Sequence, residues 1–175
     1  MRALPGLWFL ILLLATTLSG CRSASRSDKI SAPDDTGFEL WLSDHKDVLS
    51  PVDVKELATA RQQIRYKVMQ TSPGMMSADF ARAVNAEMEG KTLHELLLTS
   101  YALQIERMKV ELQNYQPQLQ RFQAHEKNRS LNAEQKQIAA EALEKLHRVM
   151  TEHEDELARL TKRLSELEHE AVAVK

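Results

Sequence analysis

The sequence is poor in the groups that carry redox, metal or nucleic-acid chemistry. It has one cysteine among 175 residues, so no disulfide can form within the chain and packing must supply its stability. Lysine and arginine number 23 against 25 aspartates and glutamates, a net charge of -2. No basic stretch is interleaved with aromatic residues, and no cysteines or histidines stand at zinc-finger spacing. These absences argue against a nucleic-acid-binding protein.

Catalytic motifs are missing as well. Four histidines precede a glutamate, which superficially matches zinc proteases: His94, His125, His153 and His169. None has the second histidine four places on, and after His153 that place holds Leu157, so no metal pair forms on one helix face. There is no Gly-x-Ser-x-Gly stretch and no cysteine nucleophile apart from Cys21. We therefore predict that the protein is not an enzyme and uses no metal or other cofactor.

The first twenty residues form an apolar leader that ends at the only cysteine. Met1 and Arg2 give a positive start, and the run from Leu4 to Leu14 is almost wholly apolar. A transmembrane anchor needs about 20 apolar residues, whereas this run is shorter and is interrupted by Pro5-Gly6. The pattern therefore predicts a signal peptide at 1–20.

The sequence Leu18-Ser19-Gly20-Cys21 resembles the lipobox of bacterial lipoproteins. The resemblance implies cleavage before Cys21, a diacylglyceryl group on its sulfur and usually an acyl group on its amine. Two or three acyl chains give a stable membrane anchor, whereas one chain holds only marginally. Arg22 follows the cysteine instead of aspartate, which by the same resemblance favours the outer membrane. We expect a lipid-anchored protein of the cell envelope, on the inner leaflet of the outer membrane and facing the periplasm.

Residues 21–36 are polar and are predicted to be a flexible tether, with ordered structure beginning near Thr36. A small helical subdomain is predicted at 37–91. The alternation of Phe38, Leu40 and Leu42 leaves its first segment open between helix and strand. Ser50-Pro51-Val52-Asp53 predicts the start of a helix that reaches about Gln70.

A further helix is predicted from Ser77, as its cap, to Gly90, as a left-handed end. Thr92 to Glu95 then reads as a capping box that opens the next helix. Gly90-Lys91-Thr92 also matches the end of a nucleotide-binding loop, but Asn85 stands where that motif needs glycine. A helix end followed by a helix start is the favoured interpretation.

Residues 92–175 carry heptads typical of a coiled-coil helical hairpin. The first series has Leu98, Ile105, Leu112 and Leu119 at a, with Tyr101, Met108, Tyr115 and Phe122 at d. The second has Leu143, Met150, Leu157, Leu164 and Ala171 at a, with Leu146, His153, Leu160, Leu167 and Val174 at d. The short connection favours antiparallel helices. One register layers Leu112 on His153, a polar residue that would set the register, and a one-heptad slip is nearly as good. Pro117 predicts a kink or a break.

The predicted fold is all-α, a small helical subdomain followed by a long antiparallel coiled-coil hairpin. The function expected from it is a structural scaffold or protein-binding adaptor, with the hairpin engaging a protein partner or a second copy. The alternative is a small-ligand or lipid-binding module. Its apolar pocket would lie between Trp41, Met69, Met75, Met76 and Phe80.

Two weaker resemblances concern the ends of the chain and its capping motifs. A lipidated Cys21, heptads and a final Lys175 resemble the major outer-membrane lipoprotein of enteric bacteria, whose C-terminal lysine is linked to peptidoglycan. Lys175 is therefore a candidate wall attachment. Leu49-Ser50-Pro51 and the Gly90-Lys91-Thr92 turn before Glu95 resemble small uncharacterised bacterial lipoproteins, which imply no known activity.

Overall fold

The structure is a computed structural model that describes residues 27–128 and 130–173. Five α-helices lie in these ranges: α2 (Asp35–His45), α3 (Pro51–Thr71), α4 (Ser77–Met88), α5 (Leu93–Lys127) and α6 (Ala133–Ala173). The described part contains no strand, only an isolated bridge between Lys29 and Thr92. The all-α prediction is confirmed, and the ambiguous Phe38 segment is helical.

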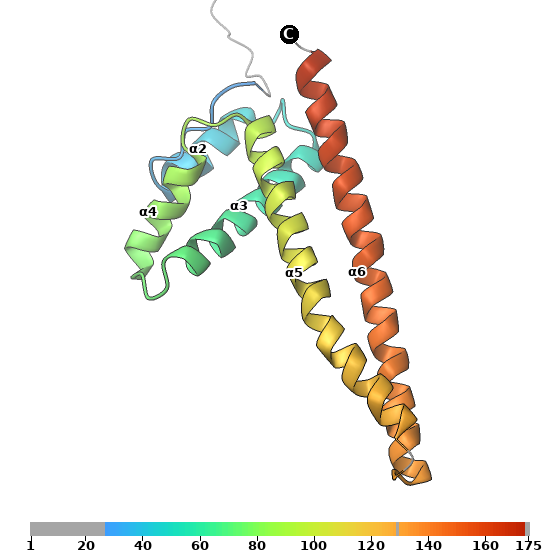
Figure 1. Ribbon diagram of the computed structural model, residues 1–175. Coiled ribbons are helices and arrows are strands. Elements are labelled where there is room, and N and C mark those ends of the chain that lie inside the picture. Colours follow the sequence, from blue (N-terminus) through green and yellow to red (C-terminus); the bar gives the residue numbers. More distant parts are fainter. Residues whose placement is uncertain (1–26, 129, 174–175) are drawn as a thin grey trace, which may run out of the picture.

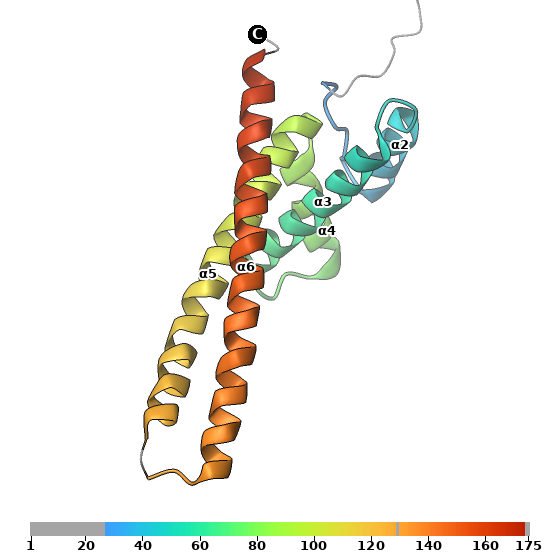
Figure 2. The same ribbon diagram turned by 90° about the vertical axis from the view of Figure 1, so that its right-hand side faces the viewer.

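Helices α5 and α6 form a long antiparallel hairpin, and α2, α3 and α4 gather on one side of its open end (Figures 1 and 2). The end of α6 lies at the same end of the molecule as the start of α5, and the connecting loop lies at the far tip. A small helical subdomain followed by a long helical hairpin is therefore the observed architecture.

Local capping chemistry sets most helix ends. Ser50 Oγ accepts a hydrogen bond from the backbone nitrogen of Asp53 at 3.1 Å, and Asp53 accepts one from Ser50 at 2.9 Å. Thr92 and Glu95 form the same reciprocal box at the start of α5. Gly90 has φ +73°, a conformation that costs other L-residues energy. These predicted caps are confirmed, but Ser77 is the first helical residue of α4 and not its cap.

The predicted tether at 21–36 is wrong from Ile30 onward. Ile30 and Ala32 are each 1% exposed, and the backbone nitrogen of Ile30 donates to the carbonyl of Lys91 at 2.7 Å. Asp34, not Thr36, caps α2 by accepting from Gly37 at 2.7 Å. The segment looked too polar to fold alone, but its few apolar side chains are buried against helices formed later in the chain. Residues 21–26 lie outside the described ranges.

One hydrophobic core joins the subdomain to the base of the hairpin. Helix α3 packs across α5, and the core contains side chains that are at most 1% exposed: Leu57, Ala60, Ile64, Leu96, Leu97, Leu160 and Leu167. Leu160 and Leu167 belong to α6, so the last helix completes a core that residues near Ile30 begin. The subdomain is therefore built onto the hairpin and does not have a core of its own.

Helix α5 runs without interruption through Pro117, so of the predicted kink or break, the break does not occur. Pro117 removes one backbone hydrogen bond, which would run to the carbonyl of Gln113. Both residues are exposed, and water can take the place of the missing donor there. The neighbouring turns are held by packing of the heptad residues against α6.

Candidate interaction surface

The hairpin extends well beyond the subdomain, and we call the extension, residues 108–127 of α5 and 133–153 of α6, the arm. At the base of the hairpin, Tyr101 and Ile105 are 8% exposed, because α3 covers the α5–α6 seam. In the arm the corresponding α5 side chains are all only half-buried: Met108, Leu112, Tyr115, Leu119 and Phe122. The heptad pattern therefore continues into the arm, where α3 no longer covers the α5–α6 seam.

Contacts with α3 identify one side of the hairpin. Arg107 of α5 donates to Gln63 of α3 at 3.0 Å, and Arg163 of α6 donates to Glu56 of α3. Because coiled-coil positions recur every seven residues, the same side can be followed along the arm. Tyr101, Gln104 and Arg159 also border α3. We call the side that continues these five positions along the arm the arm face, and its side chains include Glu111, Asn114, Tyr115, Gln118, Arg121, Phe122, Gln135, Ile138, Ala142, Lys145, Val149 and Glu152.

The arm face is hollowed near the tip. A cavity of about 270 Å³ is lined by residues of both helices and of the loop between them: Phe122, His125, Leu131, Gln135, Ile138, Ala139 and Ala142. Ile138 is 60% exposed, although it lies on the same side as α3. Apolar surface of this kind, bordered by charged groups, is typical of a protein-binding site.

His153 ties the two helices of the arm together. Its Nδ1 donates to the carbonyl of Val149 at 2.8 Å, and its Nε2 lies 3.3 Å from a carboxylate oxygen of Glu111. Its ring meets Tyr115 edge-on with centroids 5.4 Å apart. Glu111 and Tyr115 flank Leu112, so these contacts match the register that layers Leu112 on His153.

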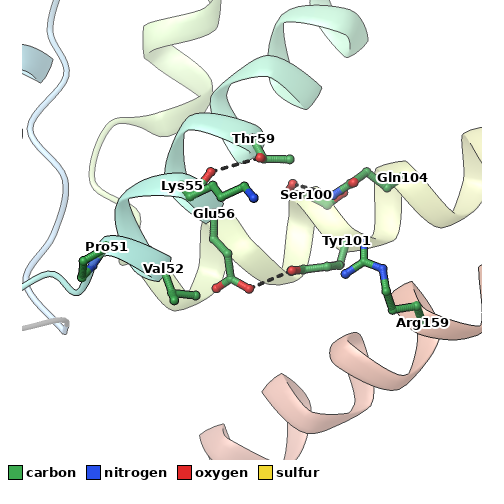
Figure 3. Close-up of a pocket in the computed structure, with 9 residues that line it drawn as sticks. All are labelled: Pro51, Val52, Lys55, Glu56, Thr59, Ser100, Tyr101, Gln104 and Arg159. Atoms are coloured by element: carbon green, nitrogen blue, oxygen red, sulfur yellow. Dashed lines mark hydrogen bonds between the residues drawn. The ribbon is translucent and has the colours of Figure 1, made fainter. Parts of the chain in front are cut away.

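A cleft of about 520 Å³ lies at the base of the hairpin, where α3, α5 and α6 meet (Figure 3). Most of its lining residues carry a polar group: Pro51, Val52, Lys55, Glu56, Thr59, Ser100, Tyr101, Gln104 and Arg159. In Figure 3 the amino end of Lys55 and the carboxamide of Gln104 approach the hydroxyl of Ser100. Lys55 makes no ion pair with another described residue.

The wall of this cleft is a closed hydrogen-bond network. Tyr101 donates to Glu56 at 2.8 Å, and Arg163 donates to both oxygens of Glu56 at 3.2 and 3.3 Å. Burial, together with the Glu56 carboxylate, raises the pKa of Tyr101. The hydrogen bonds to Glu56 raise the pKa of Arg163. Because these shifts favour a neutral Tyr101 and a charged Arg163, both groups keep the protons that they donate to Glu56. The network therefore serves as a structural joint between α3 and α6. Heptad analysis did not predict it, because Glu56 is 45 residues from Tyr101 and 107 residues from Arg163.

The residues of the alternative apolar pocket do not surround one hollow. Trp41 is 7% exposed and stacks on His45, whereas Met69 and Met76 are 54% and 76% exposed. Phe80 is half-buried, with the Arg65 guanidinium 5.5 Å from its ring centre. The structure places these side chains partly in the core and partly on the surface, so a ligand site between them is not formed.

The two predicted attachment residues, Cys21 and Lys175, lie outside the described residues. Within the described ranges, no helix is both long and apolar enough to cross a membrane. The same ranges hold no group of three or more His, Cys, Asp or Glu side chains placed to bind a metal ion.

Comparison with known proteins leaves the family of the chain open. No protein-family model, no curated protein and no solved structure matches it. The lipoprotein resemblance therefore rests on residues 1–22, and the arm face rests on the geometry of α5 and α6.

Proposed function

We propose that the protein is a lipid-anchored scaffold or adaptor of the bacterial cell envelope, and that its arm face binds another helical protein surface. The observation that carries this proposal is the arm itself. The seam between α5 and α6 keeps the heptad pattern of a packed helical bundle along the arm. Beyond the end of α3, however, no described element covers that seam. A helix seated there would extend the packing that α3 makes at the base.

The position of the lipid end supports this proposal. Ile30 is bonded to Gly90 and Lys91, immediately before α5 begins. The tip lies at the other end of α5, whose 35 residues span about 50 Å. Eight residues lie between Cys21 and Ile30, and such a segment reaches about 30 Å at most. A lipid on Cys21 would therefore hold the subdomain at the membrane and leave the arm face free.

The membrane part of the proposal is tested by palmitate labelling and membrane fractionation of three chains. The wild-type chain should incorporate palmitate and sediment with outer membranes, and Cys21→Ala should lose both properties. Arg22→Asp should keep the label but move to the inner membrane. An unlabelled wild-type chain would contradict the lipid anchor.

The binding part is tested by photo-crosslinking in cells from Phe122 and Ile138 on the arm face, with Ala140 as the matched position. Ala140 is exposed at the same end of α6 but lies at a heptad position on the other side. A partner protein should be crosslinked from Phe122 and Ile138 but not from Ala140. Equal capture from Ala140 would show that the arm is only in random contact with its neighbours.

Attachment to the cell wall remains an alternative, which rests on Lys175. The end of α6 lies at the same end of the molecule as the start of α5 (Figure 1), so a linked lysine would fix that end and still leave the arm free. Lys175→Arg should abolish any form released only by peptidoglycan digestion. If no such form exists in the wild-type chain, this alternative is wrong.

A small-ligand function is the second candidate, and the basal cleft is the observation that favours it. Lys55 and Arg159 face the cleft from α3 and α6, so an anionic ligand suits it best. Phosphate or citrate should raise the melting temperature of the wild-type chain but not that of Lys55→Gln. The same rise in both chains would point to a general salt effect.

A further inference from the structure

We propose that the turn between α3 and α4 binds a soft monovalent metal ion, copper(I), through the thioether sulfurs of Met69, Met75 and Met76. The site is separate from the arm face and needs neither the lipid anchor nor a partner protein. In Figure 1 this turn lies at the end of α3 farthest from the hairpin. Three features support the proposal: the exposure of the three side chains, the geometry of the turn and the lack of other metal ligands nearby.

The methionines of this turn are exposed, although methionine is a core residue elsewhere in the structure. Met69, Met75 and Met76 are 54%, 38% and 76% exposed. The described methionines outside the turn are all buried or half-buried: Met88, Met108 and Met150. Packing therefore accounts for the methionines of the core and the hairpin but not for those of the turn, whose side chains are open to a solute.

The backbone of the turn is fixed by its own sequence and hydrogen bonds. In Ser72-Pro73-Gly74-Met75 the proline is followed by a glycine with φ +84°, which is typical of a type II turn. The backbone nitrogen of Met75 donates to the carbonyl of Ser72 at 3.4 Å, and that of Ser72 donates to the carbonyl of Val68 at 2.9 Å. Met75 is thereby held beside the last turn of α3, which carries Met69.

Contacts between α3 and α4 bring the other two methionines to the same place. The Arg65 guanidinium lies 5.5 Å from the centre of the Phe80 ring, so these two positions face each other. Met69 lies four residues beyond Arg65 on the same face of α3. Met76 lies four residues before Phe80, and its carbonyl accepts a hydrogen bond from the Phe80 backbone nitrogen at 2.8 Å. Each helix therefore contributes one methionine at the point where the chain reverses.

Methionine side chains suit convergence on one ion from these positions. Each has three rotatable bonds and a polarizable thioether, and the exposure of these three leaves their conformations free to adjust. The backbone is already held by the turn, so binding has to order only the side chains, which lowers its cost. The turn thus offers three neutral sulfur ligands within one short segment.

The surroundings of the turn select the kind of ion. No histidine or cysteine lies between residues 46 and 93, and the carboxylate nearest in sequence to Met76, Asp79, pairs with Arg82 at 3.1 Å. Zinc(II) prefers nitrogen, thiolate or carboxylate ligands, and calcium and magnesium prefer oxygen. Soft thioether ligands select copper(I). Silver(I) has the same charge and serves as a probe that does not change its oxidation state.

Competition with the chelator bicinchoninate for copper(I), kept reduced by ascorbate, tests the site. The protein is the full chain with Cys21→Ala, purified in detergent, because Cys21 is the only cysteine and a free thiol would itself bind copper(I). This chain should bind one copper(I). Loss of an outer partner of a metal ligand costs about 10- to 100-fold in affinity, so Met69→Leu, Met75→Leu and Met76→Leu should each cost at least about tenfold.

Leucine is the sharpest substitution because it keeps the size and apolar character of methionine and removes only the sulfur. All three positions are exposed, so the fold should be retained. Met108→Leu is the matched control, since Met108 is half-buried on the arm, and it should leave the affinity unchanged. Wild-type affinity in all three turn variants would overturn the proposal, as would an equal loss in Met108→Leu.

Methionine methyl NMR with silver(I) provides an independent readout. The signals of Met69, Met75 and Met76 should shift together and reach their final positions at one equivalent of silver(I), while those of Met108 and Met150 stay in place. In Met76→Leu the shifts of the other two turn signals should need a higher silver(I) concentration, because the three sulfurs share one ion.

The outcomes distinguish one shared site from looser binding. If each turn variant binds fewer ions and the remaining methionines keep their affinity, the sulfurs act independently and the proposed site is wrong. Shifts of all methionine signals alike would show adventitious binding only, which also overturns it. None of these results bears on palmitate labelling or on crosslinking from the arm face, so the proposed function is tested separately.

Discussion

At the scale of single residues, the joint between Glu56 and Arg163 holds the first part of the fold to the last. The Glu56 side chain is 14% exposed and that of Arg163 25% exposed, so water replaces a lost partner poorly. We expect Arg163→Ala to lower the free energy of unfolding by about 2 kcal/mol, the usual cost of losing hydrogen bonds to a partly buried charge. Urea denaturation measures the change.

Arg159→Ala is the control for this prediction. Arg159 pairs with Glu156 within one turn of α6, and its side chain is 62% exposed. Exposed pairs of this kind contribute little, so the loss should stay below about 0.5 kcal/mol. Equal losses in the two variants would show that the Glu56 joint has no special role.

A second prediction concerns Glu87 and acid. The hydrogen bond from Lys67 lowers the pKa of Glu87 below its ordinary value of 4.5, so the unfolded chain binds the proton more readily. The carboxylate therefore contributes its full stability above pH 4.5 and loses it as the pH falls through the lowered pKa. Both side chains are about one-third exposed, so the contribution is about 0.5 kcal/mol.

Glu87→Gln tests this dependence. The difference in unfolding free energy between pH 7 and pH 3 should shrink by about 0.5 kcal/mol relative to the wild-type chain. Glu134→Gln should leave it unchanged, because Glu134 is exposed and makes no ion pair with another described residue. An unchanged difference in Glu87→Gln would remove the Lys67 pair as a source of acid sensitivity.

At the scale of helices, Pro117 is the main local conflict in the arm. Pro117→Ala restores the hydrogen bond to Gln113 and removes a cost of about 3 kcal/mol in a helix interior. Hydrogen exchange between residues 112 and 122 should slow accordingly. Pro51→Ala should bring no such gain, because proline is well tolerated at the first position of α3. Unchanged exchange in Pro117→Ala would mean that the arm is held by packing alone.

How far the helices could be predicted from sequence depends on the range of the interactions that make them. The caps at Ser50 and Thr92 involve groups three residues apart, and the α5–α6 seam repeats every seven, so both could be read directly. Ile30 is buried where its segment meets residues 90 and 91, and the Glu56–Arg163 joint forms only where α3 crosses the hairpin. Nothing in local periodicity specifies that crossing.

The same distinction explains what was missed at the functional surface. Heptads predicted a hairpin that could bind a partner, but they do not say which side of it is free. That side is defined by where α3 stops, which is a property of the folded chain. The polar stretch before Asp34 was likewise misread, because composition indicates whether a segment can fold alone and not whether it packs on another.

At the scale of the whole molecule, stability should decrease from the base of the hairpin to the tip of the arm. The base shares one core with α2, α3 and α4, whereas the arm is a two-helix pair whose seam is buried on the α6 side at Ala139, Leu146 and Met150 but only half-buried on the α5 side. Amides at 93–105 and 157–167 should therefore exchange only by global unfolding, and those at 115–146 by local opening at lower free energy. Hydrogen exchange of the Cys21→Ala chain measures both classes.

The same measurement reports whether a second copy occupies the arm face, because a covered arm cannot open locally without dissociating. If a second copy does so, protection at 115–146 should rise with protein concentration, and protection at 93–105 should stay constant, since binding stabilises only what it covers. In the Lys145→Glu chain, protection of residues 115–146 should stay at its low-concentration value at every protein concentration. If arm protection is independent of concentration in the wild-type chain, the arm remains single and its face serves a different protein. A rise that Lys145→Glu does not prevent would place the contact between copies elsewhere than on the arm face.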